Sequence, residues 1–193
     1  MLQAIDQAME RMGSLNYTLA RVMQVVNDIS SSALDLVRVI EMDPVLTARV
    51  LRVSNSSFFG FNEPVTSLRR ATIMMGMNTV RNLALAVAIR NAFQIQDDAC
   101  QVSSEDFWRY AVGTAVLSDL LAHKAEVSRS IMEESFVVAL LHPIGRALFI
   151  QHFPAEYREV IAVSMKRGVA TEKFETRKFS IDHTEVGVRM AER

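Results

Sequence analysis

The sequence of 193 residues predicts an all-α protein, and three observations support that prediction. Only four Pro and seven Gly occur, and eleven Met accompany many Ala, Leu, Arg and Glu, which are residues that favour helices. Apolar residues recur at the three- and four-residue spacing of amphipathic helices. No alternation of apolar and polar residues persists beyond about five positions, the length that a strand needs. We therefore expect a two-lobed helical bundle.

The first half of the chain predicts six helices. Two of them meet at a tight corner, where Asp43 can accept hydrogen bonds from free backbone donors and Pro44 occupies the first helical position. The last of the six is apolar almost all round, as is typical of a helix at the centre of a bundle. The expected helical segments are residues 2–12, 15–31, 31–43, 43–55, 67–76 and 77–94.

The second half predicts five further helices after an acidic connection. The expected helices are 104–124, 128–141, 143–152, 154–168 and one from about 182 to the end, capped by Asp182. We expect an N-terminal lobe over 1–94, a connection over 95–102 and a second lobe over 103–193. The chain stops in the middle of a helical pattern, which indicates that the second lobe is incomplete.

Composition and charge are those of a soluble globular protein. Half of the residues are hydrophobic, 22% are charged, and the net charge is -1. The single Cys100 excludes an internal disulfide and fits a reducing compartment. The start of the chain lacks a signal-peptide run, and the apolar run "LALAVAI" is too short to span a bilayer. We expect a cytoplasmic protein with no membrane segment; the sequence leaves its oligomeric state open.

One loop, "SNSSFFGFNEPVTS", carries three aromatic residues, Phe58, Phe59 and Phe61, and is followed by Arg69 and Arg70. Aromatic side chains beside Arg are common anchors of protein interfaces, so this is the predicted partner-binding surface. The alternative is that the three Phe fold back and bridge the two lobes, because large apolar side chains are usually buried.

The segment 44–96 is basic, with six Arg against one acid, Glu63. The corner around Asp43 also has the outline of a helix-turn-helix. Its second helix, however, offers mainly Thr47, Arg49 and Arg52 for reading bases, fewer than such helices tend to carry. Nucleic-acid binding is therefore not the favoured interpretation.

Familiar catalytic motifs are absent from the sequence. There is no phosphate-binding glycine loop and no Gly-x-Ser-x-Gly elbow. The acids Asp97, Asp98, Glu105 and Asp106 form a solvated cluster, and nothing promises the buried or charge-coupled site that a general acid needs. Nearby carboxylates are expected to raise the pKa of Cys100 and leave it a bystander.

The four His divide into two kinds. His123 and His152 fall in the last turns of helices, where capping or surface roles are expected. His142 and His183 lie where helices begin and could meet across a cleft. Two imidazoles alone make a weak divalent site, because a hydrolytic metal usually needs three protein ligands and an open position for water.

The motifs in this order resemble one family. "DPVLTARVLRVSNSSFFG", "GMNTVRNLALA", "FWRYAVGTAVL", "FVVALLHPIGRALF", "FPAEYREVI" and "DHTEVGVRMAER" are similar to the HDOD domain, the HD-related output domain of bacterial signalling proteins. The resemblance runs from about residue 15 to residue 193. It implies an all-helical fold related to HD-type metal phosphohydrolases and a regulatory role in signalling.

The resemblance also implies where metal ligands would lie. The parent motif has a His, a His-Asp doublet and a later His or Asp; this sequence has Tyr110, then His142 with Pro143, then His183. Proline has no donor atom and a neutral phenol is a poor ligand for divalent metals. Pro143 suits the first turn of a helix instead. We therefore predict a degenerate metal site, no catalytic residues and no cofactor.

The predicted function is a non-enzymatic signalling module that binds a signalling protein or another domain of a longer chain. A different hypothesis is a sensor of a nucleotide or other phosphate ligand, or a residual phosphodiesterase. Its cleft would be lined by Tyr110, His142, Arg146 and His183, and Arg is well suited to phosphate.

Overall fold

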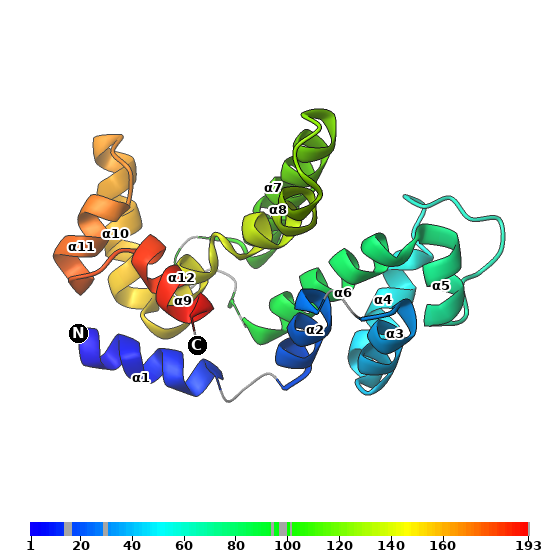
Figure 1. Cartoon of the computed structure of the whole chain (residues 1–193). Helices are drawn as coiled ribbons and strands as arrows, with labels where there is room; N and C mark the ends of the chain where they lie inside the picture. Colours follow the sequence, from blue (N-terminus) through cyan, green and yellow to red (C-terminus); the bar gives the residue numbers. More distant parts are fainter. Residues whose placement is uncertain (14–16, 29–30, 94, 97–99, 101, 193) are drawn as a thin grey trace. The chain divides into compact units, whose positions relative to one another are not determined.

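The computed structural model describes residues 1–13, 17–28, 31–93, 95–96, 100 and 102–192. These residues form twelve α-helices and no strand (Figure 1), which confirms the predicted all-α class. The chain divides into two compact units. Residues 16–92 form the first, termed the middle unit, and residues 1–15 with 93–193 form the second, termed the terminal unit.

The middle unit is built around one central helix. Its helices are α2 (Tyr17–Asn27), α3 (Ala33–Glu41), α4 (Pro44–Ser54), α5 (Leu68–Met75) and α6 (Met77–Ala92). Helix α6 contacts each of the other four, and its Val80, Ala84 and Leu85 are fully buried. The prediction that the segment 77–94 lies at the centre of a bundle is therefore confirmed.

Local capping chemistry sets the corner between α3 and α4. The Asp43 carboxylate accepts hydrogen bonds from the backbone N–H groups of Val45 and Leu46, each at 2.9 Å, and Pro44 follows at the first helical position. Ser32 and Asp35 form a capping box at the start of α3. These contacts satisfy backbone donors that a helix start leaves free.

The terminal unit contains the remaining helices. They are α1 (Leu2–Gly13), α7 (Ser104–Lys124), α8 (Arg129–Leu141), α9 (Ile144–His152), α10 (Pro154–Arg167), α11 (Glu172–Phe179) and α12 (His183–Ala191). Helices α7 and α8 pack along each other as an antiparallel hairpin (Figure 1), whereas α9 packs on α12 and α10 on α11. The rings of Phe149, Tyr157 and Phe179 stack in the core that α9, α10 and α11 share.

The expected boundary of the N-terminal lobe, 1–94, needs one correction: α1 belongs to the terminal unit. Its apolar face buries Ile5, Ala8 and Met9, and α1 contacts α9. The Asp6 carboxylate lies 3.9 Å from the Arg189 guanidinium of α12. The apolar face of an amphipathic helix can pack on any complementary apolar surface. The position of α1 at the start of the sequence therefore did not reveal that it belongs to the terminal unit. Of the predicted connection 95–102, residues 97–99 and 101 lie outside the described residues.

Helix α11 was not predicted. Its sequence, EKFETRKF, has few apolar residues, so the usual periodicity is too weak to indicate a helix. The helix nevertheless buries Glu175 and Phe179, which are four residues apart and therefore share one face. This missed element supplies the most buried carboxylate of the candidate site.

Helices α9 and α12 cross at two glycines. A Cβ atom placed on Gly145 would lie 1.9 Å from the carbonyl oxygen of His183 and 3.0 Å from the backbone nitrogen of Gly187. Only glycine permits this approach, which holds the start of α12 against the start of α9. Within the described ranges, none of the helices has the length and apolar character that crossing a bilayer requires.

Candidate functional site

The four residues of the predicted cleft fall into two groups with separate partners. The first group is Tyr110 on α7 and His142 at the end of α8. Their rings meet edge to face with centroids 5.3 Å apart, and the Tyr110 hydroxyl lies 3.2 Å from His142 Nε2. His142 Nδ1 lies 2.5 Å from the Ala139 carbonyl oxygen, so Nδ1 carries the proton and Nε2 accepts from Tyr110. Both ring nitrogens of His142 are thus used inside the protein.

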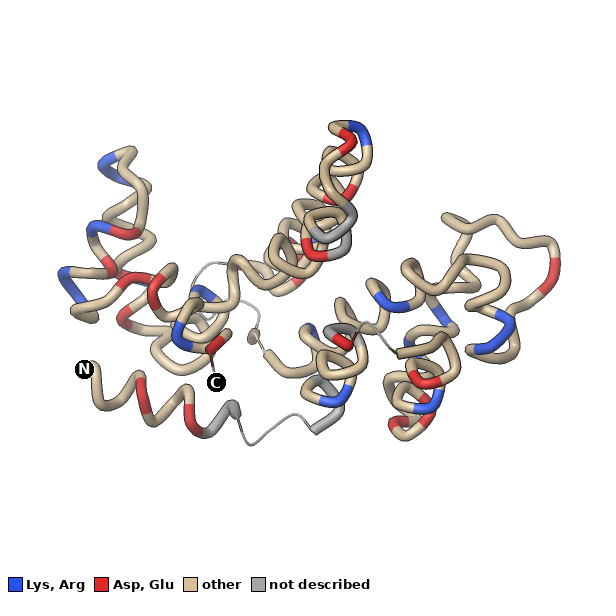
Figure 2. The backbone as a smooth tube through the Cα atoms, viewed as in Figure 1, with Lys and Arg blue, Asp and Glu red and all other residues tan. Residues whose placement is uncertain are grey.

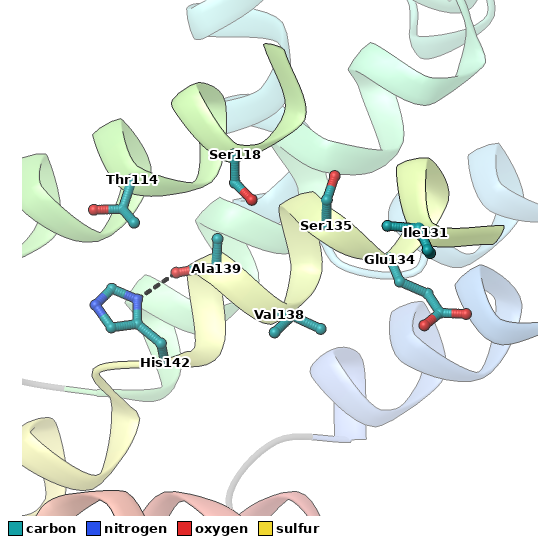
Figure 3. A pocket seen from close by; sticks show the side chains of 8 residues that line it. All are labelled: Thr114, Ser118, Ile131, Glu134, Ser135, Val138, Ala139 and His142. Atoms are coloured by element: carbon teal, nitrogen blue, oxygen red, sulfur yellow. Dashed lines mark hydrogen bonds between the residues drawn. The ribbon is translucent and has the colours of Figure 1, made fainter. Parts of the chain in front are cut away.

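A pocket of about 430 Å³ extends from His142 along the hairpin (Figure 3). His142 lies at one end and Glu134 near the other, with uncharged and apolar side chains between them. The lining residues are Thr114, Ser118, Ile131, Glu134, Ser135, Val138, Ala139 and His142. This lining contains one carboxylate and no Arg or Lys, which is a poor environment for a phosphate group.

The second group joins Arg146 on α9 to His183 on α12 through Glu172 on α11. One Glu172 carboxylate oxygen lies 3.8 Å from Arg146 Nη2 and 3.9 Å from His183 Nε2. Arg146 Nη2 also donates to the Thr171 hydroxyl at 3.3 Å. The guanidinium that the sensor hypothesis assigns to a phosphate ligand is therefore already engaged by a carboxylate and a hydroxyl.

Glu175 holds His183 from the other side. One Glu175 oxygen accepts from the backbone N–H of His183 at 2.9 Å and from its Nδ1–H at 2.6 Å. The other oxygen accepts from the Tyr157 hydroxyl at 2.8 Å. All three residues are buried. The arrangement fixes the tautomer and orientation of His183, as a carboxylate behind an imidazole does in general.

Burial alone would raise the pKa of Glu175. The hydrogen bonds from the side chain and backbone of His183, the charge of His183 and the Tyr157 hydroxyl outweigh it, so the pKa of Glu175 is lowered. Burial, followed by the charge of Glu175 and the hydrogen bond to it, raises the pKa of Tyr157 above its usual range. Glu175 therefore stays ionised as an acceptor while Tyr157 stays protonated as a donor.

Sequence reasoning missed Glu175, Tyr157 and Glu172. The acids that it considered lie in the segment 97–106, whereas the acid that is fully buried and coupled to His183 is Glu175. One signal was available: Glu175 and Phe179 are four residues apart, and the burial of a Phe on a helix predicts burial of its neighbour on the same face.

The donors at the metal positions of the parent motif do not fit a hydrolytic divalent ion. Both nitrogens of His142 are hydrogen-bonded and Pro143 supplies no donor, which leaves the Nε2 of His183 as the imidazole nitrogen still open to a metal at these positions. In the part of the chain that the structure describes, no three His, Cys, Asp or Glu residues come together in a way that could hold a metal. Pro143 is buried and is the N-cap residue of α9, which begins at Ile144. The predicted helix began at residue 143, so Pro143 lies one position before the first turn in which it was expected.

The aromatic loop, residues 55–67, projects from the middle unit with fixed geometry. Phe58 is 86% exposed, while Phe59 and Phe61 are partly buried. Phe58 packs edge to face on Phe59 at 5.0 Å, and Phe59 stacks on Phe61 at 5.9 Å. Gly60 makes the turn between them with a φ of 60°. Phe58 is therefore an accessible ring on an aromatic stack, as the interface prediction requires.

One side chain closes the base of this loop. The Asn55 amide oxygen accepts from the Val65 N–H at 2.7 Å, and its amide nitrogen donates to the Val65 carbonyl at 2.9 Å and to the Leu51 carbonyl at 2.8 Å. Val65 itself is buried. Among the predicted basic residues, Arg70 forms an ion pair with Glu63 and Arg69 is exposed.

The other predicted residues have ordinary roles. Glu105 and Asp106 both pair with Arg109 on the surface, whereas Asp97 and Asp98 lie outside the described residues. His123 is exposed near the end of α7, with Nδ1 2.8 Å from the Asp119 carbonyl oxygen. His152 lies in the last turn of α9, as predicted.

Cys100 needs a correction. It is buried, and its thiol donates to the Pro154 carbonyl at 3.1 Å. Burial, and not a surrounding of carboxylates, raises the pKa of this thiol, and the charge of Arg158 opposes the rise.

Two of the three side chains on which the helix-turn-helix interpretation rested have partners inside the middle unit. The Thr47 hydroxyl donates to the Ile40 carbonyl at 2.9 Å, and Arg49 donates to Asn91 on α6. Both side chains are therefore used within the middle unit, whereas Arg52 is exposed.

Comparison with known proteins gives one clear relationship. Two crystal structures match nearly the whole chain: a "Putative phosphohydrolase" from Shewanella amazonensis SB2B, 28% identical over 98% of this chain with a TM-score of 0.76, and an HDOD domain protein with unknown function from Geobacter sulfurreducens, 23% identical over 99% with a TM-score of 0.74. This chain covers 65% of each of those chains. An uncharacterized protein of Treponema pallidum is 23% identical over 175 residues, which are 91% of this chain and 33% of that protein.

The model of the HDOD domain family matches residues 12–193. The match covers nearly all of both units and includes Tyr110, His142, Pro143 and His183. The chain therefore belongs to the HDOD domain family.

Proposed function

We propose that this protein is a cytoplasmic signalling output module that acts by binding a protein partner through its aromatic loop and does not hydrolyse phosphate esters. The observation that carries the proposal is Phe58, a large aromatic side chain that is 86% exposed on a loop with a fixed base. An aromatic anchor of this kind buries much area at low entropic cost when a partner covers it.

Membership of the HDOD family supports the signalling part of the proposal. A further solved structure, a "Putative signal transduction protein" from Marinobacter aquaeolei VT8, shares the fold, with a TM-score of 0.77 over 98% of this chain. It is 22% identical and this chain covers 45% of it, so that structure supports the fold and not the role.

The hydrogen bonds of His142 and the proline beside it support the non-enzymatic part. A divalent metal at these positions would have to displace Tyr110 from His142 Nε2, and Pro143 would offer it no ligand. The phosphate-sensor hypothesis has less support, because Arg146 is engaged by Glu172 and the pocket beside His142 contains a carboxylate.

The experiment is an affinity capture from the native lysate with three forms of the tagged chain. The wild type is compared with Phe58→Ser and with Val45→Ser, a matched control. Val45 is 57% exposed in the first turn of α4, whereas the loop follows the other end of that helix. We expect Phe58→Ser to lose a specific protein that Val45→Ser retains, with unchanged melting temperatures. Equal retention by both variants contradicts the proposal.

A further inference from the structure

The base of the aromatic loop brings basic side chains to both of its sides. Arg52 lies in the last turn of α4, which leads into the loop, and Arg69 lies in the first turn of α5, which leads out of it. The Asn55–Val65 hydrogen bonds draw the two ends of the loop together, and α4 contacts α5. Arg52 and Arg69 are both exposed. Phe58 therefore extends from a base with an exposed guanidinium in each flanking helix.

The charge of the middle unit is uneven along its sequence. Residues 44–92 contain six Arg, no Lys and one acidic residue, Glu63, which is in the loop. Figure 2 shows the basic positions along α4, α5 and α6 and the acidic position in the loop between α4 and α5. Glu63 is paired with Arg70. The segment that carries Phe58 therefore has an excess of positive charge, and its one carboxylate is paired with Arg70.

We infer that the aromatic loop, with Arg52 and Arg69, receives an acidic segment of a partner protein that carries a large apolar side chain. The apolar side chain packs on the Phe58 ring, and Asp or Glu residues on either side pair with the two guanidinium groups. Arg suits this role because its planar fork binds carboxylates in pairs of hydrogen bonds. This inference rests on the proposed function and names the chemistry of the partner.

The arrangement is ready for binding before a partner arrives. Asn55 fixes the base, the Phe59 N–H donates to the Ser56 carbonyl at 3.2 Å, and the Phe59–Phe61 stack supports the exposed ring. A preformed loop loses little conformational entropy on binding, so a short acidic segment can suffice as a ligand. Because the charges are exposed, the complex is expected to weaken as salt rises.

The test places the photo-crosslinking residue p-benzoylphenylalanine at position 58 of the full chain, in nuclease-treated native lysate. The same residue at position 45 is the control. Crosslinked peptides are sequenced by mass spectrometry and their charge is read around the crosslinked residue. We expect proteins crosslinked at position 58 and not at 45, through segments in which Asp and Glu outnumber Lys and Arg.

A second arm tests the two guanidinium groups. The double variant Arg52→Gln/Arg69→Gln is expected to lower the crosslink yield at position 58 at least tenfold. The matched control is Arg38→Gln/Arg90→Gln, which removes the same charge from exposed residues of α3 and the last turn of α6. We expect the control to keep the yield within twofold.

The outcomes separate two kinds of failure. Crosslinks to neutral or basic segments, or equal losses in the two double variants, overturn the acidic partner but leave the loop as a binding surface. In a parallel sample that is not treated with nuclease, crosslinks to nucleic acid and none to protein overturn both the acidic protein partner and the proposed function. A position-58 yield no greater than that at position 45 also overturns the proposed function itself.

Discussion

Glu175 is a charged residue that the fold encloses completely. Its carboxylate stays ionised because three hydrogen bonds replace the water that burial removes. Two of them come from His183, the residue that the family motif places at a metal position. In this chain His183 is buried in the core. It is held by the Glu175 carboxylate of α11, which in turn accepts a hydrogen bond from Tyr157 of α10.

Glu175→Gln should lower the free energy of unfolding by about 2–3 kcal/mol at neutral pH, because it removes charge-assisted hydrogen bonds from a buried site. Urea unfolding monitored by circular dichroism measures the change. Tyr157→Phe is the milder control, since it removes one donor and should cost about 1 kcal/mol. An unchanged midpoint for Glu175→Gln would contradict the role assigned to this carboxylate.

The same residue predicts a pH dependence. The folded protein lowers the pKa of Glu175 below the ordinary value of 4.5. Its stabilising contribution is therefore fully present above the pKa of the unfolded chain, and it is lost as the pH falls through the lower pKa of the folded state. We expect the wild type to lose stability below about pH 4.5 more steeply than Glu175→Gln does. Thermal melts measure this dependence. Melting temperatures that fall in parallel with pH for the two proteins would contradict the prediction.

At the scale of helices, the crossing of α9 and α12 depends on a missing side chain. Gly145→Ala would place a methyl group 1.9 Å from the His183 carbonyl oxygen, which forces the two helices apart. We expect a loss of at least about 3 kcal/mol or failure to fold. Gly113→Ala is the matched control in the exposed interior of α7, where an added Cβ meets nothing within 4 Å. It should stabilise by about 0.5–1 kcal/mol, and thermal melts compare the two variants.

The loop base is a second element whose stability can be tested. Asn55→Ala removes the side chain that bonds both backbone groups of Val65. We expect the Val65 amide to lose protection from hydrogen exchange by at least tenfold, while amides of α6 change little. Asn55→Asp keeps the acceptor for that N–H and should preserve most of the protection. Full protection in Asn55→Ala would show that the clamp does not order the loop.

Elements were predictable where local chemistry decides them. Asp43 and Asp182, the two predicted caps, each accept from a backbone N–H three residues later in the helix that follows, and a sequence shows such spacing directly. Helix α11 was missed because the burial of Glu175 depends on His183 and Tyr157, which come from other helices. The assignment of α1 to the terminal unit was missed for a similar reason: the apolar face of α1 is visible in the sequence, but the helix on which that face packs is not.

In the candidate site, too, the features that local sequence decides were predictable and the features that packing decides were not. The family resemblance alone singled out Tyr110, His142 and His183, by aligning them with the metal positions of the parent motif. It did not reveal that the Tyr110 hydroxyl occupies Nε2 of His142, or that Arg146 and His183 share Glu172. Those pairings depend on how α7 lies along α8 and how α11 packs beside α12, and neither arrangement is encoded in local spacing.

At the scale of the whole molecule, we expect the protein to bind divalent metals only weakly. Purified chain that has been incubated with manganese, iron or zinc and then desalted should carry substoichiometric metal, because the described residues bring together no set of three ligands for a hydrolytic metal. Elemental analysis by mass spectrometry measures the ratio. One metal per chain, lost when His183 is replaced by Ala, would contradict the assignment of this residue to the core.

We propose that the protein works through the aromatic loop and not through Tyr110 and His142. The most direct measurement is one quantitative capture from the same lysate with wild type, Phe58→Ser and the double variant Tyr110→Phe/His142→Ala, whose substituted side chains are exposed. The account predicts that Phe58→Ser loses the partner at least tenfold while the double variant retains it. Retention by Phe58→Ser and loss by the double variant would contradict the account and place the function at the Tyr110–His142 pair.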